Sequence, residues 1–406
     1  MEGFDFTFML EFSREKRNVE HIASVAKGLT AVTIVSTATY ASTTSGNVYR
    51  LTARRRSPVL KAGRATFGRV CAAMVVIGFS GAVGNTPLIE LRELSRELGR
   101  RVLAKAEFLN PGGSVKDRAA RGIVDDAQAC GALQPAGTIV EGTAGNTGIA
   151  LALVASERGY KSVFVMPDDQ SREKIDLLRV YGSDVRVVPA VPFTDPENYY
   201  HVARRIAKET AGAFWANQFE NTANRRAHEA TTGPEIWEQT GGSIDAFVAS
   251  AGTGGTIAGV ATALKTRRSD ILTVLCDPMG SALYNYVNNG ELTTEGESDL
   301  EGIGIKRITA NFEAAPIDRA IRVTDGQAIA MAHWLLEHEG IFVGGSSGLN
   351  VVGAAKVAGD LPTGSTVVTI LCDGGGRYVS RMFDDAWMRE NNFAKQQALP
   401  AILGRG

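Results

Sequence analysis

The chain has 406 residues, of which 44% are hydrophobic and 21% charged, and this composition fits a globular protein too long for one small core. Its 43 Lys and Arg against 44 Asp and Glu give a net charge of -1, which argues against a general binder of nucleic acids or other polyanions. The four widely spaced cysteines exclude a disulfide scaffold and offer no zinc-binding spacing, so no metal site is expected.

The first part of the chain differs in charge from the remainder. Between Glu20 and Glu90 there is no acidic residue, whereas Lys and Arg recur, and the stretch is rich in Ser, Thr and Ala. This pattern is typical of an organellar transit segment, so we expect residues 1–80 to be a disordered or targeting leader. The mitochondrion is favoured over the plastid, and a cytoplasmic protein with a disordered extension is the alternative. The apolar run 70–83 is shorter than the ~20 residues that span a bilayer, so membrane contact through the leader has no support.

From residue 84 onward, short β-branched runs alternate with helix-length segments. The predicted strands are Val102–Phe108, Thr138–Glu141, Ser162–Met166, Asp184–Val188, Ala213–Phe219, Asp245–Ser250, Leu272–Cys276 and Thr366–Leu371. The predicted helices are Lys116–Cys130, Asn146–Arg158, Pro196–Thr210, Ala223–Gln239, Thr256–Lys265 and Gln327–His338. Such alternation indicates an α/β fold with parallel strands buried between helices. We predict two domains, 81–230 and 231–393, followed by a tail, 394–406.

A glycine-rich loop, Gly252-Thr253-Gly254-Gly255-Thr256, lies between a predicted strand and a predicted helix. Glycines there let backbone N–H groups approach an anion closely, and the start of a helix favours negative charge, so phosphate is the natural ligand. The loop is not a dinucleotide-binding fingerprint, because Ile257 stands where the third glycine would be. A simple tight turn is the other interpretation.

Two further loops have the same strand–loop–helix layout. In Thr143-Ala144-Gly145-Asn146-Thr147-Gly148, the polar side chains either cap the helix or form a cradle for a carboxylate, and both interpretations stay open. The loop Gly344-Gly345-Ser346-Ser347-Gly348 matches the nucleophile motif of α/β-hydrolases. No histidine follows Ser346, so the order that a hydrolase needs is missing.

Lys116 falls at the start of a predicted helix, after the loop Asn110–Val115. The positive end of the helix dipole disfavours an ammonium group there, which favours a lowered pKa and a nucleophilic amine; a solvated lysine is the alternative. One ligand class needs a helix-start lysine, a phosphate loop, a carboxylate loop and a serine loop together. It is pyridoxal 5'-phosphate (PLP) carrying an amino acid.

At these residues the chain resembles the cysteine synthase and cystathionine β-synthase family of fold-type II PLP enzymes. The similarity runs from GNTPLIEL at Gly84–Leu91 to CDGGGRYVSRMF at Cys372–Phe383. The resemblance implies a fold like that of tryptophan synthase β, with two three-layer αβα domains and mostly parallel sheets. It also implies that Lys116 is the catalytic lysine that holds the cofactor aldehyde. Further cofactor contacts would come from Asn146, Gly252, Thr253, Gly254, Gly255, Thr256 and Ser346, and substrate contacts from Thr143, Ala144, Asn146, Thr147 and Gln218.

The family further implies an activity: β-replacement that makes L-cysteine from O-acetyl-L-serine and sulfide through an α-aminoacrylate intermediate, in a homodimer of the transferase class. Condensation of the cystathionine β-synthase type and cysteine desulfhydrase or dehydratase activity remain alternatives. The usual family loop has serine where this chain has Ala144, which removes one hydroxyl group and keeps a non-catalytic binding protein open as well. The motifs and the basic leader resemble a eukaryotic cysteine synthase-like subgroup with organellar extensions.

Overall fold

The computed structural model describes residues 39–43, 46–50, 75–143, 145–168, 170, 172–395 and 397–404. The chain divides into two units, Met1–Ala73 and Met74–Gly406. In the first, β1 (Thr39–Thr43) and β2 (Gly46–Arg50) pair as an antiparallel hairpin, and the rest of the predicted leader before residue 75 lies outside the described residues. Within the described ranges, no helix has the length and apolar character needed to cross a membrane.

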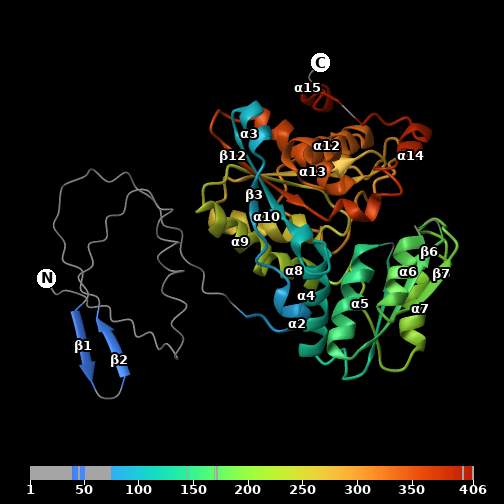
Figure 1. Cartoon of the computed structure of the whole chain (residues 1–406). Helices are drawn as coiled ribbons and strands as arrows, with labels where there is room; N and C mark the ends of the chain where they lie inside the picture. The colour runs from blue at the N-terminus through green and yellow to red at the C-terminus, as the bar shows by residue number, and fades with distance from the viewer. Residues whose placement is uncertain are drawn as a thin grey trace. The chain divides into compact units, whose positions relative to one another are not determined.

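The smaller of the two sheets in Met74–Gly406 has four parallel strands (Figure 1). Their spatial order is β7 (Asp184–Val188), β6 (Lys161–Pro167), β5 (Thr138–Gly142) and β8 (Ala213–Trp215). Both faces of the sheet are covered. Val140 of β5 packs with α7 (Tyr199–Glu209), whereas its neighbour Ile139 packs with α4 (Lys116–Ala129) and α5 (Asn146–Arg158). Alternate side chains of a strand point to opposite faces, so two apolar helix layers enclose the sheet.

The larger sheet has six strands. Their order is β11 (Arg319–Val323), β10 (Leu272–Pro278), β9 (Ala246–Ala249), β12 (Thr366–Leu371), β4 (Arg101–Ala106) and β3 (Leu88–Glu90). All neighbours are parallel except the edge strand β3, which runs antiparallel to β4. One face packs against α12 (Asp325–Glu339) and α13 (Gly345–Asp360), the other against α9 (Thr232–Thr240) and α10 (Gly255–Arg267). The predicted three-layer α/β architecture with mostly parallel sheets is therefore confirmed.

Some elements differ from the sequence-based expectation. The single helix predicted over Ala223–Gln239 is two helices, α8 (Ala223–Ala230) and α9, because the backbone leaves the helical conformation at Thr231. Strands β3 and β4 lie early in the chain but complete the sheet formed by later strands. The division into domains at residue 230 stays a prediction. The remaining short elements are α2 (Gly78–Ala82), α3 (Arg92–Leu98), η2 (Glu107–Leu109), α6 (Arg172–Val180), α11 (Leu283–Asn289), η3 (Gly375–Tyr378), α14 (Asp385–Glu390) and α15 (Leu399–Ile402).

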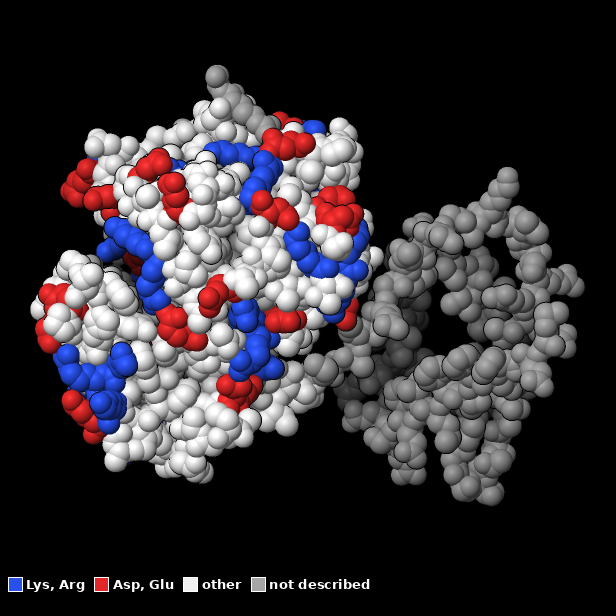
Figure 2. Space-filling view, turned by 180° about the vertical axis from the view of Figure 1, so that it is seen from behind, with Lys and Arg blue, Asp and Glu red and all other residues white. Residues whose placement is uncertain are grey.

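Charged side chains on the face seen in Figure 2 are mixed in sign. Lys and Arg side chains lie close to Asp and Glu side chains across the described part of that face. Exposed ion pairs among the described residues include Arg226 with Asp126 at 2.6 Å. Short-range pairing of this kind gives little electrostatic field at a distance from the surface.

Candidate active site

Lys116 is the first residue of α4, and its loop is tied to the end of β12. The Val115 N–H donates to the Cys372 carbonyl oxygen at 2.8 Å, and the Gly112 N–H donates to the Asp117 carboxylate at 2.5 Å. The loop that carries Lys116 therefore lies against the carboxyl end of β12. Burial lowers the pKa of the Lys116 amine, while Cys372 and Asp373 act in the opposite direction. The lowered pKa agrees with the sequence-based expectation, with burial rather than the helix dipole as the main cause.

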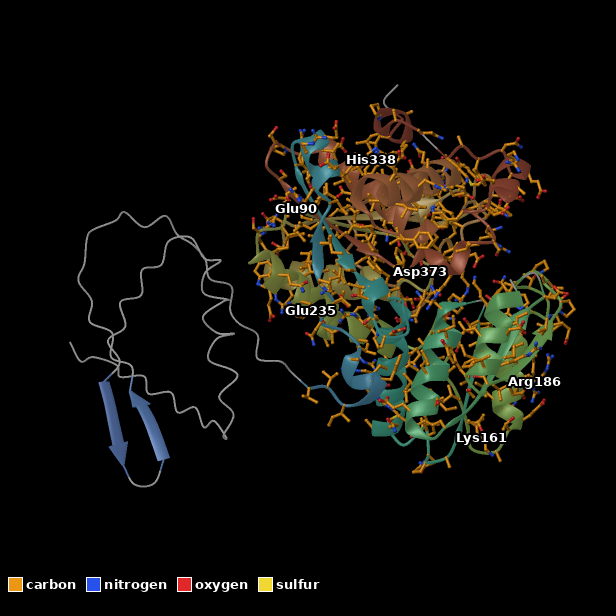
Figure 3. The ribbon with its side chains drawn as sticks, in the orientation of Figure 1. Glu90, Lys161, Arg186, Glu235, His338 and Asp373 are labelled. Carbon is orange, nitrogen blue, oxygen red and sulfur yellow. The ribbon has the colours of Figure 1, made fainter. Side chains whose placement is uncertain are left out.

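Asp373 lies at the carboxyl end of β12, and its carboxyl group links the two sheets (Figure 3). It is 1% exposed. Its Oδ2 accepts hydrogen bonds from the Asn146 Nδ2 and the Tyr378 hydroxyl, both at 2.7 Å. Its Oδ1 has no hydrogen-bond partner among the described residues. Asn146 begins α5, so this carboxylate joins the loop after β5 to the strand that lies next to the lysine loop.

The loop after β5 presents the predicted carboxylate-binding groups. The Thr143 hydroxyl oxygen accepts from the Gly145 N–H at 3.3 Å. The Thr147 hydroxyl donates to the Gln218 Oε1 at 2.6 Å, and both side chains are buried. Gln218, a predicted substrate contact, lies more than 70 residues after Thr147 in the chain, and the fold brings the two side chains together. Ala144 lies outside the described residues, so its predicted contact stays a prediction.

The predicted phosphate loop follows β9 and leads into α10. Gly254 has a φ of +85°, and a Cβ atom there would lie 2.6 Å from the Cβ of Phe312, so only glycine fits this position. The hydroxyl oxygen of Thr253 accepts from the Asn224 Nδ2 at 3.0 Å. In the first turn of α10, the Gly255 N–H donates to the Thr253 hydroxyl oxygen at 3.4 Å. The N–H groups of Thr256 and Ile257 have no carbonyl partner within the helix, so they are available to an anion.

Ser346 is the second residue of α13 and is buried next to the end of β12. Its hydroxyl bonds to the Cys372 side chain, which also lies close enough to Lys116 to influence its charge. Burial raises the pKa of the Cys372 thiol to about 12, so this group stays protonated at neutral pH. The serine loop and the lysine loop thus both lie near Cys372 at the carboxyl end of β12.

The sequence analysis missed several polar residues that connect these loops. Asn224 donates to the Gln218 carbonyl oxygen as well as to Thr253, and so joins the carboxylate loop to the phosphate loop. Arg377 donates to the Asn146 side chain and to the Gly112 carbonyl oxygen. One local signal was available: Asp373 comes almost directly after a buried strand, where sites of α/β proteins form.

The donor set fits PLP. A primary amine of lowered pKa suits the aldehyde, and a row of backbone N–H groups with two threonine hydroxyls suits a phosphate dianion. A neutral hydroxyl at Ser346 suits the pyridine nitrogen, and the Asn146 amide suits the phenolic oxygen of the cofactor ring. These groups come from four separate loops, and the hydrogen bond from Asn146 to Asp373 connects the loop after β5 to the end of β12.

Comparison with known proteins agrees with this chemistry. The family model "Pyridoxal-phosphate dependent enzyme" matches residues 79–373. The chain belongs to the pyridoxal-phosphate-dependent enzymes. Cysteine synthase 1 of Emericella nidulans is 52% identical over 333 residues, which cover 81% of this chain and 90% of that protein. The putative mitochondrial cysteine synthase of Saccharomyces cerevisiae is 43% identical over 332 residues, or 76% of this chain and 84% of that protein.

Among solved structures, the O-acetylserine dependent cystathionine β-synthase of Helicobacter pylori is similar to this PLP-dependent enzyme. The TM-score is 0.69 and the identity 36%, covering 76% of this chain and 98% of that one. The family assignment and the fold-type II architecture therefore agree, and PLP is the cofactor. The role of each site residue stays a prediction.

Proposed function

We propose that this enzyme makes L-cysteine from O-acetyl-L-serine and sulfide, replacing the acetate on the β-carbon in a reaction of the transferase class. The observation that carries the proposal is the burial of the Lys116 amine within the electrostatic influence of Asp373, which in turn accepts a hydrogen bond from Asn146 of the carboxylate loop. The 52% identity to a cysteine synthase supports this choice of substrates.

In this proposal Lys116 binds the cofactor aldehyde, and its freed amine then takes the proton from the α-carbon of the substrate. Burial favours the neutral amine, which is the form that accepts a proton. The bound cofactor supplies electron withdrawal from the α-carbon. The Lys116 Nζ also returns the proton once sulfide has added to the β-carbon.

Thr143, Thr147 and Gln218 would hold the substrate carboxylate, together with Asn146 and the backbone of Ala144. The Thr147 hydroxyl donates to Gln218 Oε1, and the Gln218 side chain also bonds to the buried Glu141 carboxyl group. This arrangement orients the amide of Gln218 before the substrate arrives, which reduces the cost of ordering it on binding.

The remaining cofactor contacts follow from the same placement. The phosphate would lie on the backbone N–H groups of Gly252–Thr256, the cofactor's 3′-oxygen at Asn146 and the pyridine nitrogen at Ser346. Ser346 is neutral, so it does not stabilise a protonated pyridine nitrogen as a carboxylate would. A weaker electron sink favours elimination and replacement over transamination.

The test is a side-by-side assay of the purified full chain with O-acetyl-L-serine plus sulfide and with L-serine plus L-homocysteine. Faster cysteine formation from the first pair supports the proposal. The second pair tests a cystathionine β-synthase activity, which the similarity to the Helicobacter pylori enzyme favours as the second candidate. If O-acetyl-L-serine neither turns over nor alters the cofactor spectrum, a non-catalytic binding protein replaces both.

Two properties of the whole protein belong to the proposal. We expect a homodimer, as in this enzyme family, and light scattering of the purified protein measures this directly. We also expect residues 1–80 to direct the protein to mitochondria, because the stretch between Glu20 and Glu90 is basic and acid-free and one similar yeast protein is named as mitochondrial. A fluorescent protein fused behind residues 1–80 that stays in the cytoplasm would contradict this.

A further inference from the structure

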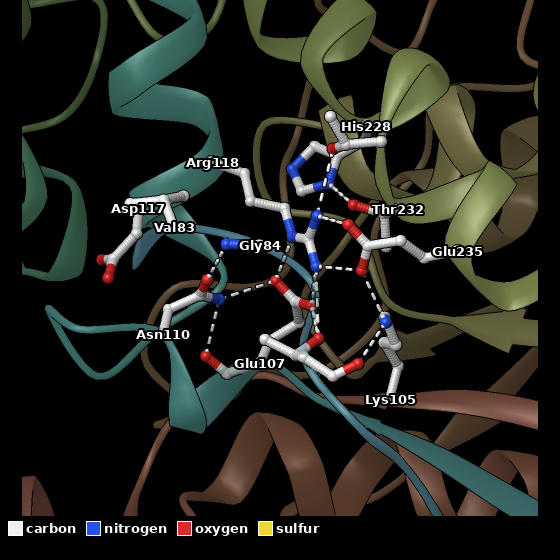
Figure 4. Close-up of polar contacts among 12 residues, drawn as sticks. Val83, Gly84, Lys105, Glu107, Asn110, Asp117, Arg118, His228, Thr232 and Glu235 are labelled. Atoms are coloured by element: carbon white, nitrogen blue, oxygen red, sulfur yellow. Dashed lines mark hydrogen bonds and ion pairs between the residues drawn. The ribbon is translucent and has the colours of Figure 1, made fainter. Parts of the chain in front are cut away.

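A buried imidazole lies directly behind the predicted phosphate loop. His228 on α8 is 1% exposed. Its Nδ1 is 2.9 Å from the Thr232 hydroxyl oxygen, and its Nε2 is 3.2 Å from the Thr256 hydroxyl oxygen. Figure 4 shows the ring between Thr232 and the Arg118 side chain. Thr256 is the last residue of the predicted phosphate loop, so His228 contacts this loop through the Thr256 hydroxyl.

Close packing of two helices brings the ring to this place. A Cβ atom added at Gly259 of α10 would lie 2.8 Å from the Cβ of His228 and 2.8 Å from the Glu229 backbone nitrogen. Only glycine permits α8 and α10 to approach this closely. Gly259 lies three residues after Thr256, on the same face of α10, so the approach at Gly259 carries His228 to the Thr256 hydroxyl.

The ring is neutral at the pH values where the enzyme works. Burial holds the pKa of His228 well below its usual range, and the nearby Arg118 and Lys116 lower it further, against a smaller opposing effect of Glu235. A neutral imidazole has one N–H donor and one acceptor nitrogen. The two threonine contacts must therefore run in opposite directions, one accepted by the ring and one donated by it.

The Thr232 hydroxyl decides which direction applies. It is fully buried, and within the described part of the chain its hydrogen-bond partner is His228 Nδ1. A buried hydroxyl whose proton has no acceptor is costly, so the Thr232 hydroxyl donates to Nδ1. The single proton of the neutral ring is therefore on Nε2. His228 then donates to the Thr256 oxygen, and the Thr256 hydroxyl keeps its own proton for another acceptor.

We infer that His228 is a positioning residue that fixes Thr256 as a hydrogen-bond donor to the cofactor phosphate. The relay runs from the Thr232 hydroxyl through the imidazole to the Thr256 hydroxyl and then to the anion. Charged acceptors such as phosphate strengthen the bond that reaches them. This inference rests on the proposal that the loop Gly252–Thr256 holds the phosphate.

The first measurement is the affinity of the full-length apoenzyme for PLP, obtained by titrating the protein with the cofactor. Losing a hydrogen bond to a charged group weakens binding by about ten- to hundredfold, which is the effect expected for Thr256→Val, whereas Thr256→Ser should bind normally. His228→Met, which keeps volume but has no donor, should weaken binding by about three- to tenfold because the Thr256 proton is no longer directed. His228→Gln places an N–H donor near the same site and should recover most of the affinity.

A double-mutant cycle separates this relay from a general effect on folding. If His228 acts through Thr256, adding His228→Met to Thr256→Val causes no further loss of PLP affinity. Equal losses for His228→Met in both backgrounds would overturn the relay. The ³¹P NMR signal of bound PLP should move in His228→Met and return in His228→Gln, and an unmoved signal in His228→Met contradicts the relay as well.

The unmodified enzyme offers a test that does not depend on variant folding. Long-range ¹H–¹⁵N NMR of the holoenzyme distinguishes the two neutral tautomers of a histidine, and we expect the His228 proton on Nε2. A proton on Nδ1 would overturn the inference. Normal PLP affinity in Thr256→Val would also overturn the relay, because the Thr256 hydroxyl would then not bind the phosphate. The proposed site fails on a different result, namely if Lys116→Ala retains the visible absorbance of the bound cofactor.

Discussion

Helix α4 begins between two buried polar regions that differ in how completely their groups are paired. On one side, Arg118 bonds to Glu107 and Glu235, both at 2.7 Å, and Lys105 bonds to Glu235 at 2.6 Å (Figure 4). We call these four residues the charge network. On the other side, the Lys116 amine is buried within the electrostatic influence of Asp373, whose Oδ1 has no hydrogen-bond partner among the described residues.

The difference distinguishes residues that stabilise the fold from residues that can bind a ligand. In the charge network, two positive and two negative side chains satisfy one another, so nothing remains for a ligand, and the network fixes α4 against β4 and α9. At Lys116, burial shifts an amine toward its neutral form without a carboxylate in direct contact. Perturbed groups with unused bonding capacity are the ones suited to bind a cofactor.

The largest expected effect comes from removing the amine. Lys116→Ala should abolish the visible absorbance of the bound cofactor and lower turnover by at least about a thousandfold, since the same nitrogen binds the aldehyde and moves the proton. The urea concentration that unfolds half of the apoenzyme should stay close to that of the unmodified chain, because Lys116 lies outside the charge network. Retained turnover would refute its assignment.

Breaking the charge network should instead cost stability. Arg118→Met leaves Glu107 buried without its cationic partner and leaves Glu235 with Lys105 alone, so the free energy of unfolding should fall by about 3–5 kcal/mol. Urea denaturation of the apoenzyme measures this loss. Combining Arg118→Met with Glu107→Gln removes one stranded charge and should restore part of it. A single variant as stable as the unmodified protein would show that the network contributes nothing.

Asp373→Asn sharpens the comparison at the site itself. Removing this negative charge takes away an effect that raises the pKa of Lys116, so the pKa of the amine should fall further. Apoenzyme binds PLP through the neutral amine, so the rate of binding rises as the amine loses its proton. The pH at which this rate is half maximal should therefore shift to a lower value. A midpoint that moves upward or stays fixed would contradict the placement of Asp373 beside Lys116.

Glu235 of the charge network and Asp117, which follows Lys116, should make the free energy of unfolding depend on pH in opposite ways. Burial alone would raise the pKa of Glu235, but Arg118 and Lys105 lower it to about 2 from 4.5, so its stabilisation is complete above pH 4.5 and is lost as the pH falls toward 2. Burial raises the pKa of Asp117 from 3.8 to about 7, so its contribution is lost as the pH rises from 4 to 7.

Two conservative variants check these slopes by urea denaturation across pH. Glu235→Gln should weaken the loss of stability in acid, and Asp117→Asn should flatten the decline between pH 4 and 7. Slopes equal to those of the unmodified protein in either window would contradict the corresponding assignment.

The smallest effect is expected at an exposed pair. Arg226 and Asp126 lie 2.6 Å apart, with side chains 51% and 47% exposed. Arg226→Met should change the free energy of unfolding by less than about 1 kcal/mol, because water solvates both charges when they separate. Arg226→Met makes the same chemical change as Arg118→Met at an exposed position, so it is the matched control for burial. If both variants lost the same free energy of unfolding, the buried charge network would be no more stabilising than the exposed pair.

Local patterns in the sequence were enough for the architecture and for the type of site. Alternating β-branched and helical segments predicted a parallel α/β fold, and the glycine turns marked where strands lead into helices. Lys116, Thr253 and Ser346 were each identifiable from the few residues around them, because turn chemistry and helix starts depend on near neighbours. The resemblance to a PLP family then supplied their expected roles.

The tertiary structure decided the contacts that bring those pieces together. Asn146 and Asp373 are 227 residues apart, and β4 pairs with β12 across most of the chain. Neither contact leaves a trace in local periodicity, because long-range pairing depends on which surfaces fit once all the strands are buried. The same holds for the charge network and for His228: the sequence shows that these residues are present, and only the fold determines which charges pair and which groups remain for a ligand.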